Sequence, residues 1–211
     1  MKICTLCPRM CAVDRKSGER GICGQTTEIK VARAALHFWE EPCISGEMGS
    51  GAVFFSGCAL HCVFCQNENI ANGTAGKVIS TERLGEIFLE LQEKGANNIN
   101  LVTPGQFVPQ IIKAVELARN QNLKIPIVYN TSSYENVDTI RSLEGIVDIY
   151  LPDFKYFDTA LSAKYSHAPD YPAVAKAVIA EMVRQTGAAV FENGEDSLMK
   201  RGTIVRHLIL P

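Results

Sequence analysis

The stretch that decides the fold of this chain is Gly51-Ala-Val-Phe-Phe55-Ser-Gly-Cys58-Ala-Leu-His-Cys62-Val-Phe-Cys65. Its first five residues are small or apolar and predict a buried strand that ends at Ser56-Gly57. The loop that follows carries Cys58, Cys62 and Cys65 in the spacing C-x3-C-x2-C. Three thiolates on one tight loop can hold three irons of a cubane cluster, and because no fourth cysteine follows closely, one iron would stay open. The alternatives are zinc, which prefers four ligands, and inert buried thiols.

Downstream of this stretch, short β-branched runs alternate with helical patterns. Further strands are expected at 98–103, 125–131, 146–151 and 203–210, the last after a hairpin at Glu192-Asn193-Gly194. The intervening helices are expected to bury apolar positions at helical spacing: Leu84, Ile87, Phe88 and Leu91; Val108, Ile111, Ile112 and Val115; Val137, Ile140 and Leu143; Val174, Val178 and Met182. This alternation predicts an α/β fold with a parallel sheet, with functional residues at the carboxyl ends of the strands.

Composition narrows the class of protein. The 211 residues carry 21 Lys plus Arg against 23 Asp plus Glu, a net charge of −2, which lacks the basic excess expected of a nucleic-acid binder. The uncharged stretch from Met48 to Asn67 is long enough to cross a bilayer, but its glycines and polar residues favour a buried strand and a loop. No signal peptide is evident, so we expect a cytoplasmic protein without a membrane partner, whose clustered cysteines are ligands rather than disulfides.

The cysteine triplet, with Gly57 before it and Phe64 before its last cysteine, resembles the signature of the radical S-adenosylmethionine (SAM) superfamily. The resemblance implies a partial parallel β/α barrel and a 4Fe-4S cluster on Cys58, Cys62 and Cys65, whose open iron binds the methionine part of SAM. One electron from a reductant such as flavodoxin or ferredoxin then splits SAM, and the resulting 5′-deoxyadenosyl radical abstracts a hydrogen from the substrate.

The longer stretch 56–67 resembles pyruvate formate-lyase activating enzymes and their relatives. By this resemblance, SAM contacts are expected from residues at the carboxyl ends of successive strands: Phe64, Asn67, Thr103, Gly105, Asn130, Thr131, Asp153, Lys155 and Arg206. The segment 103–106 departs from the family pattern, because it keeps a hydroxyl and a glycine but has no acid.

Four further cysteines stand near the N-terminus: Cys4, Cys7, Cys11 and Cys23. They make a complete ligand set for a tetrahedral zinc ion or a second iron–sulfur cluster, and the spacing does not choose between these. The alternative is free thiols in a disordered tail. We expect residues 1–45 to form this small cysteine-rich module and residues 46–211 to form the radical SAM core.

Three functions remain open from the sequence. The resemblance favours an activating enzyme that places a glycyl radical on a partner enzyme. The alternatives are a radical SAM catalyst acting on a small molecule or peptide, and a non-catalytic cluster-binding fragment. The last is suggested by the end of the chain after a fifth strand, since relatives have a sixth strand and its helix. We expect that fifth strand, 203–210, to be buried on both faces and to leave an uncovered edge that associates with another chain.

Overall fold

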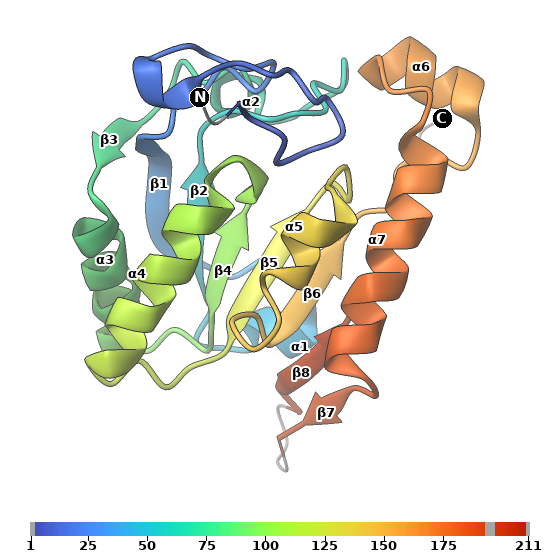
Figure 1. Ribbon diagram of the computed structural model, residues 1–211. Coiled ribbons are helices and arrows are strands. Elements are labelled where there is room, and N and C mark those ends of the chain that lie inside the picture. Colours follow the sequence, from blue (N-terminus) through green and yellow to red (C-terminus); the bar gives the residue numbers. More distant parts are fainter. Residues whose placement is uncertain (1–2, 193–196, 210–211) are drawn as a thin grey trace.

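One open sheet organises the chain. The computed structural model describes residues 3–192 and 197–209. Its eight strands lie in the order β3-β1-β2-β4-β5-β6-β8-β7 (Figure 1). Five neighbouring strands are parallel: β2 (Ser50–Phe55), β4 (Ile99–Val102), β5 (Ile127–Thr131), β6 (Ile149–Pro152) and β8 (Met199–Thr203). The predicted α/β fold with a partial, unclosed parallel barrel is therefore confirmed.

Antiparallel strands extend the sheet at both edges. They are β1 (Ile29–His37), β3 (Lys77–Ile79) and β7 (Val190–Phe191). β1 pairs with β2 along its length, from Val31 opposite Phe55 to His37 opposite Ser50. The first 45 residues thus supply one strand of the same sheet that carries the cysteine loop, defined here as residues 58–65.

The long helices lie on one face of the sheet, and the short helix that carries Ile44 packs against the other face, beside Val128, Ile149 and Leu151 (Figure 1). The helices are α1 (Pro42–Ser45), α2 (Glu68–Ala71), α3 (Thr81–Glu93), α4 (Val108–Asn120), α5 (Val137–Arg141), α6 (Thr159–Ser166) and α7 (Tyr171–Thr186), with 3-10 turns at Arg15–Ser17 and Gly105–Phe107. Ser80 caps α3, because its hydroxyl accepts the Arg83 N–H at 3.1 Å. Gly95, with φ +84°, lets the chain turn away after that helix.

The main core lies between this helical layer and the sheet. Leu84 and Phe88 of α3 and Ile111 of α4 are fully buried against Ile99 and Leu101 of β4. These are the positions that the helical spacing predicts. Each such side chain contributes about 1.5–3 kcal/mol through burial, so the strand ends are held on a rigid scaffold.

The predicted fifth strand is misplaced. The strand is β8, Met199–Thr203, whereas the prediction was 203–210. Val205 is 50% exposed and Ile209 is 84% exposed, so the expected burial is wrong for these residues. The apolar residues after position 203 resemble a buried strand, whereas β8 itself contains Lys200, Arg201 and Gly202 and has no apolar run. β7 pairs with β8, so the expectation of an uncovered fifth strand is also wrong. Asn193, Gly194 and Leu210 lie outside the described residues.

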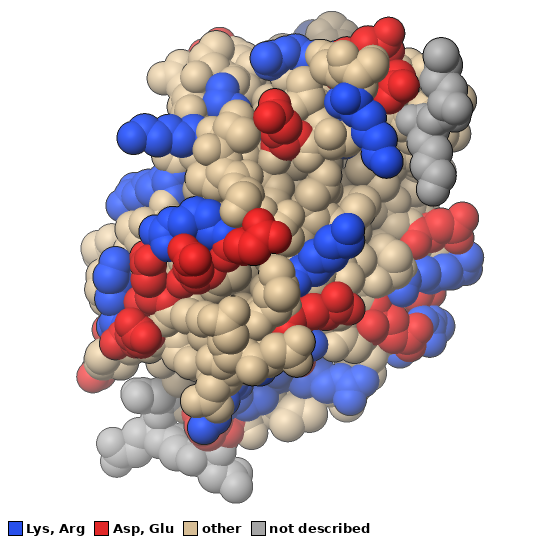
Figure 2. All heavy atoms as spheres, turned by 60° about the vertical axis from the view of Figure 1, so that its left-hand side comes forward, with Lys and Arg blue, Asp and Glu red and all other residues tan. Residues whose placement is uncertain are grey.

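The uncharged stretch 48–67 forms β2 and a loop, as predicted, and Val53 and Phe55 are fully buried. Among the described residues, no helix combines the length and apolar character needed to cross a membrane. Figure 2 shows the side of the molecule that carries α3, where acidic and basic side chains are interspersed. Arg83, which forms ion pairs with Glu86 and Glu90, is one example.

Candidate active site

The cysteine loop leaves β2 at the carboxyl edge of the parallel strands. Gly57 has φ +88° and His61 has φ +51°, and the Cys65 N–H donates to the Cys62 carbonyl at 3.0 Å. This tight path keeps the three cysteines on one short turn. The Leu60 N–H lies 3.4 Å from the Cys58 Sγ, and the Ser166 hydroxyl lies 3.0 Å from the Cys62 Sγ. Both donors would stabilise thiolates.

The chemistry of this donor set fits an iron–sulfur cluster. All eight cysteines are free thiols. Burial raises the pKa of the Cys58 thiol, and the neighbouring Cys62 and Cys65 raise it further, because three thiolates would repel one another. A cationic cluster core would reverse that repulsion. Within residues 3–192 and 197–209, no three Cys, His, Asp or Glu side chains are already arranged to hold one metal ion. Thiol rotation would therefore accompany binding.

A large cavity of about 790 Å³ opens beside the cysteine loop at the carboxyl ends of the strands. It is lined by all three cysteines of the loop and by eight of the nine residues predicted to contact SAM: Phe64, Asn67, Thr103, Asn130, Thr131, Asp153, Lys155 and Arg206. Segments up to about 150 residues apart in sequence thus meet around one space.

Arg206 links several of these side chains. Its Nε donates to the Asp153 Oδ1 at 2.8 Å and its Nη2 donates to the Asn130 Oδ1 at 2.7 Å. The Lys155 ammonium lies 2.7 Å from the Asp153 Oδ2. The floor of the large cavity therefore presents two cations, an acid and an amide that hold each other in place.

Comparison with known proteins agrees with this arrangement. Residues 52–184, more than half of the chain, match the Radical SAM superfamily. The chain belongs to this superfamily. It is also 27% identical, over its whole length, to an uncharacterized protein of Methanocaldococcus jannaschii, and it spans 57% of the length of that relative. The matched region holds the cysteine loop and the ends of β2, β4, β5 and β6 that meet at the large cavity.

Glu40 lines the large cavity and was missed by the strand-end prediction. It follows β1, and its carboxylate accepts from the Asn100 side chain at 2.5 Å, from Asn130 at 3.2 Å and from Arg206 at 3.0 Å. Burial raises its pKa, whereas the Arg206 guanidinium lowers it. The sequence Trp39-Glu-Glu-Pro42 was the available signal, but nothing in it places an acid inside the sheet.

Tyr171, at the start of α7, fixes the ends of two strands beneath the cavity. Its hydroxyl lies 2.8 Å from both the Ser132 and the Asp153 carbonyls and accepts the Lys155 N–H at 2.8 Å. Burial raises its pKa, so the hydroxyl stays protonated and able to donate. The helical spacing of apolar residues in α7 does not predict this role for Tyr171.

Gly105 is the predicted SAM contact that the structure does not bring to the large cavity. A Cβ at Gly105 would lie 2.5 Å from the carboxylate oxygens of Glu135, which occupies the adjoining space. Glu135 accepts from the hydroxyls of Thr131 and Tyr129, and burial raises its pKa to about 7. Gly105 and Glu135 line a second, small cavity instead.

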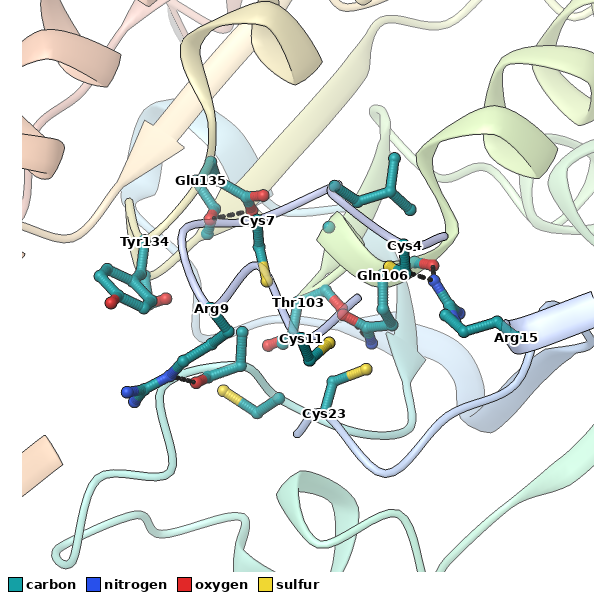
Figure 3. A pocket seen from close by; sticks show the side chains of 16 residues that line it. Cys4, Cys7, Arg9, Cys11, Arg15, Cys23, Thr103, Gln106, Tyr134 and Glu135 are labelled. Carbon is teal, nitrogen blue, oxygen red and sulfur yellow. Dashed lines mark hydrogen bonds between the residues drawn. The ribbon is translucent and has the colours of Figure 1, made fainter. Parts of the chain in front are cut away.

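That small cavity, of about 30 Å³, is lined by the four N-terminal cysteines, Cys4, Cys7, Cys11 and Cys23, and by Cys58 of the cysteine loop (Figure 3). The structure thus places both sets of cysteines on the same edge of the sheet, with Cys58 lining both cavities.

Proposed function

We propose that this chain binds a 4Fe-4S cluster through Cys58, Cys62 and Cys65 and SAM in the large cavity, and that it cleaves SAM reductively to initiate hydrogen abstraction. One observation carries the proposal: the three thiols of the cysteine loop line the same cavity as the polar strand-end residues. When bound, the cluster and SAM together supply one-electron cleavage to a 5′-deoxyadenosyl radical. The chain's own part is to bind, orient and enclose these groups.

The polar residues of the cavity suit the two ends of an amino acid. Asp153 and Glu40 are acids that could receive an ammonium group, and Lys155 and Arg206 are cations that could receive a carboxylate. Asn130 and its neighbour Thr131 offer further donors and acceptors. We propose that this set holds the methionyl end of SAM, while Phe64, just before Cys65, and Asn67, two residues after it, contact the rest of the molecule.

We further propose that a glycyl radical enzyme is the substrate, on the resemblance of residues 56–67 to activating enzymes, with a flavodoxin or ferredoxin as reductant in the cytoplasm. A second class of substrate, a small molecule or peptide, is favoured by the size of the cavity, since about 790 Å³ lies within the range of small-molecule sites. The test is the fate of the radical. A glycyl radical in a partner supports activation, whereas label transfer from a small compound into 5′-deoxyadenosine supports the alternative.

Cluster and SAM binding are tested by electron paramagnetic resonance. The protein is reconstituted anaerobically with iron and sulfide, reduced with dithionite, and measured with and without SAM. We expect a 4Fe-4S signal that SAM perturbs, and its loss in a Cys62→Ala variant. Cys43→Ala is the matched control, because Cys43 lines neither cavity and should leave the signal unchanged. A cluster signal that SAM leaves unaltered would instead support a cluster-binding fragment.

A further inference from the structure

The four N-terminal cysteines converge on one enclosed space, although they lie on loops. The chain turns at Met10, just before Cys11, and at Ala12, just after it, where φ is +41° and +53°. The sulfurs of Cys11 and Cys23 lie 2.8 and 3.9 Å from the position that a Cβ on Gly21 would occupy, so they are close neighbours. Figure 3 shows the four side chains around the small cavity. The spacing C-x2-C-x3-C with one distant cysteine suits a four-thiolate site.

Two arginines give an independent sign that this space holds negative charge. Arg15 is only 4% exposed, yet within the described residues neither it nor Arg9 forms an ion pair with a carboxylate. Arg15 instead donates to the carbonyls of Gln25, Thr26 and Gln106, and its Nη1 lies 3.9 Å from the Cys4 Sγ. Buried charges are normally paired. Four thiolates around one divalent cation carry two negative charges, which the two guanidiniums would balance.

The size of the space decides which metal it suits. A cavity of about 30 Å³ has room for one or two water-sized groups, and therefore for a single ion, whereas a cubane adds eight atoms. The large cavity has that room. We propose that Cys4, Cys7, Cys11 and Cys23 bind one zinc ion at full thiolate coordination, after rotation of their side chains into the small cavity.

This zinc site would anchor the cysteine loop. Arg9, two residues after Cys7, donates from Nε to the Ala59 carbonyl at 2.8 Å and from Nη2 to the Ser166 carbonyl at 2.8 Å. The His61 Nε2 lies 2.9 Å from the Ile22 carbonyl. A Cβ at Gly57 would overlap the Cys23 carbonyl oxygen. Zinc binding by residues 4–23 would therefore fix the loop from one side, a role that rests on the proposed function, although the zinc site itself does not.

The test uses the full chain with Cys58, Cys62 and Cys65 all replaced by alanine, purified anaerobically. We expect about one zinc per chain by elemental analysis, and a loss of tenfold or more when Cys7→Ala is added. Cys43→Ala in the same background is the matched control and should keep the zinc. Protein grown with cobalt should show the absorption of a tetrahedral cobalt–thiolate site. Because this background lacks the loop cysteines, the result is independent of SAM cleavage.

Three results would overturn the proposal. Stoichiometric iron and acid-labile sulfide in place of zinc would assign a second cluster. Neither metal, with residues 3–25 still resistant to protease, would mean that no metal holds the segment. Full zinc retention after Cys7→Ala would place the ion elsewhere. Should the Cys7 variant fail to fold, zinc release by a mercurial reagent decides. It is measured on the triple-alanine background that also carries Cys43→Ala, in which Cys4, Cys7, Cys11 and Cys23 are the remaining cysteines. Four thiols titrated per zinc freed supports the site, and zinc freed without them contradicts it.

Discussion

Replacing Arg206 by methionine removes the cation that links three sides of the large cavity. In this variant Glu40 loses a 3.0 Å ion pair while its side chain is only 11% exposed. Breaking a buried pair costs about 3–5 kcal/mol. The cost should be lower here, because Asp153 keeps its 2.7 Å contact with Lys155 and the Arg206 side chain is 28% exposed. We therefore expect the free energy of unfolding to fall by about 2 kcal/mol, a drop in melting temperature of about 4–8 °C.

The pH dependence of the loss of stability shows whether the unpaired Glu40 carboxylate causes it. Burial already raises the pKa of Glu40, and loss of Arg206, which lowers it, should raise it further. A carboxyl whose pKa is higher in the folded state than in the unfolded state binds more protons when folded. The free energy of unfolding therefore falls as the pH rises from the unfolded pKa to the folded pKa. The penalty of Arg206→Met should thus be small near pH 4 and larger near pH 8.

The assay is urea unfolding of the apo chain followed by circular dichroism. Adding Glu40→Gln should recover roughly half of the loss, about 1 kcal/mol, because the amide removes the unpaired charge. Arg83→Met is the matched control, since its ion pairs are exposed and contribute little to stability. A loss of stability in Arg206→Met that equals that of the control, or that stays constant between pH 4 and pH 8, would show that Arg206 does not stabilise a buried Glu40 carboxylate.

Three further perturbations test the packing around the two cavities. Gly105→Ala should lower the free energy of unfolding by about 1–3 kcal/mol in urea titrations, because its methyl group would collide with the Glu135 carboxylate; an unchanged midpoint would contradict this. Arg15→Met should make the N-terminal segment sensitive to protease, since the carbonyls it holds lose their donor, and a pattern like that of the parent would contradict its anchoring role. Arg9→Gln should speed hydrogen exchange in the cysteine loop about tenfold while leaving α4 unchanged, and equal rates would show that its contacts with Ala59 and with α6 are dispensable.

Local patterns predicted the elements that stand next to each other in sequence. The buried strand at 51–55 follows from a continuous run of small and apolar residues, and the helix that buries Leu84 and Phe88 follows from apolar residues at helical spacing. The placement of the strand ends follows too, since parallel strands bring their carboxyl ends to one edge. This rule places Asn130, Asp153 and Arg206 around one cavity, as the structure does, although the strand before Arg206 ends at Thr203 rather than at residue 210.

Long-range placement could not be predicted in the same way. β1 pairs antiparallel with β2, and its exposed and half-buried residues give no clear alternation to reveal it. The segment after β1 then carries Glu40 to the wall of the large cavity, a position that depends on tertiary contacts with Asn100 and Arg206. Gly105 lies beside the Glu135 carboxylate at the small cavity rather than at the large cavity. This position also depends on tertiary contacts, which local residue spacing does not predict.

The product of SAM cleavage shows whether this chain carries out radical SAM chemistry. The reconstituted chain is reduced with dithionite in the presence of SAM, and 5′-deoxyadenosine is quantified by liquid chromatography and mass spectrometry. We expect formation that depends on reductant and protein, that is lost in Cys62→Ala and that is kept in Cys43→Ala. Absence of 5′-deoxyadenosine from protein that carries a full 4Fe-4S cluster and binds SAM would contradict reductive SAM cleavage by this chain. Equal formation by the Cys62 variant would contradict the assignment of the cluster to the cysteine loop.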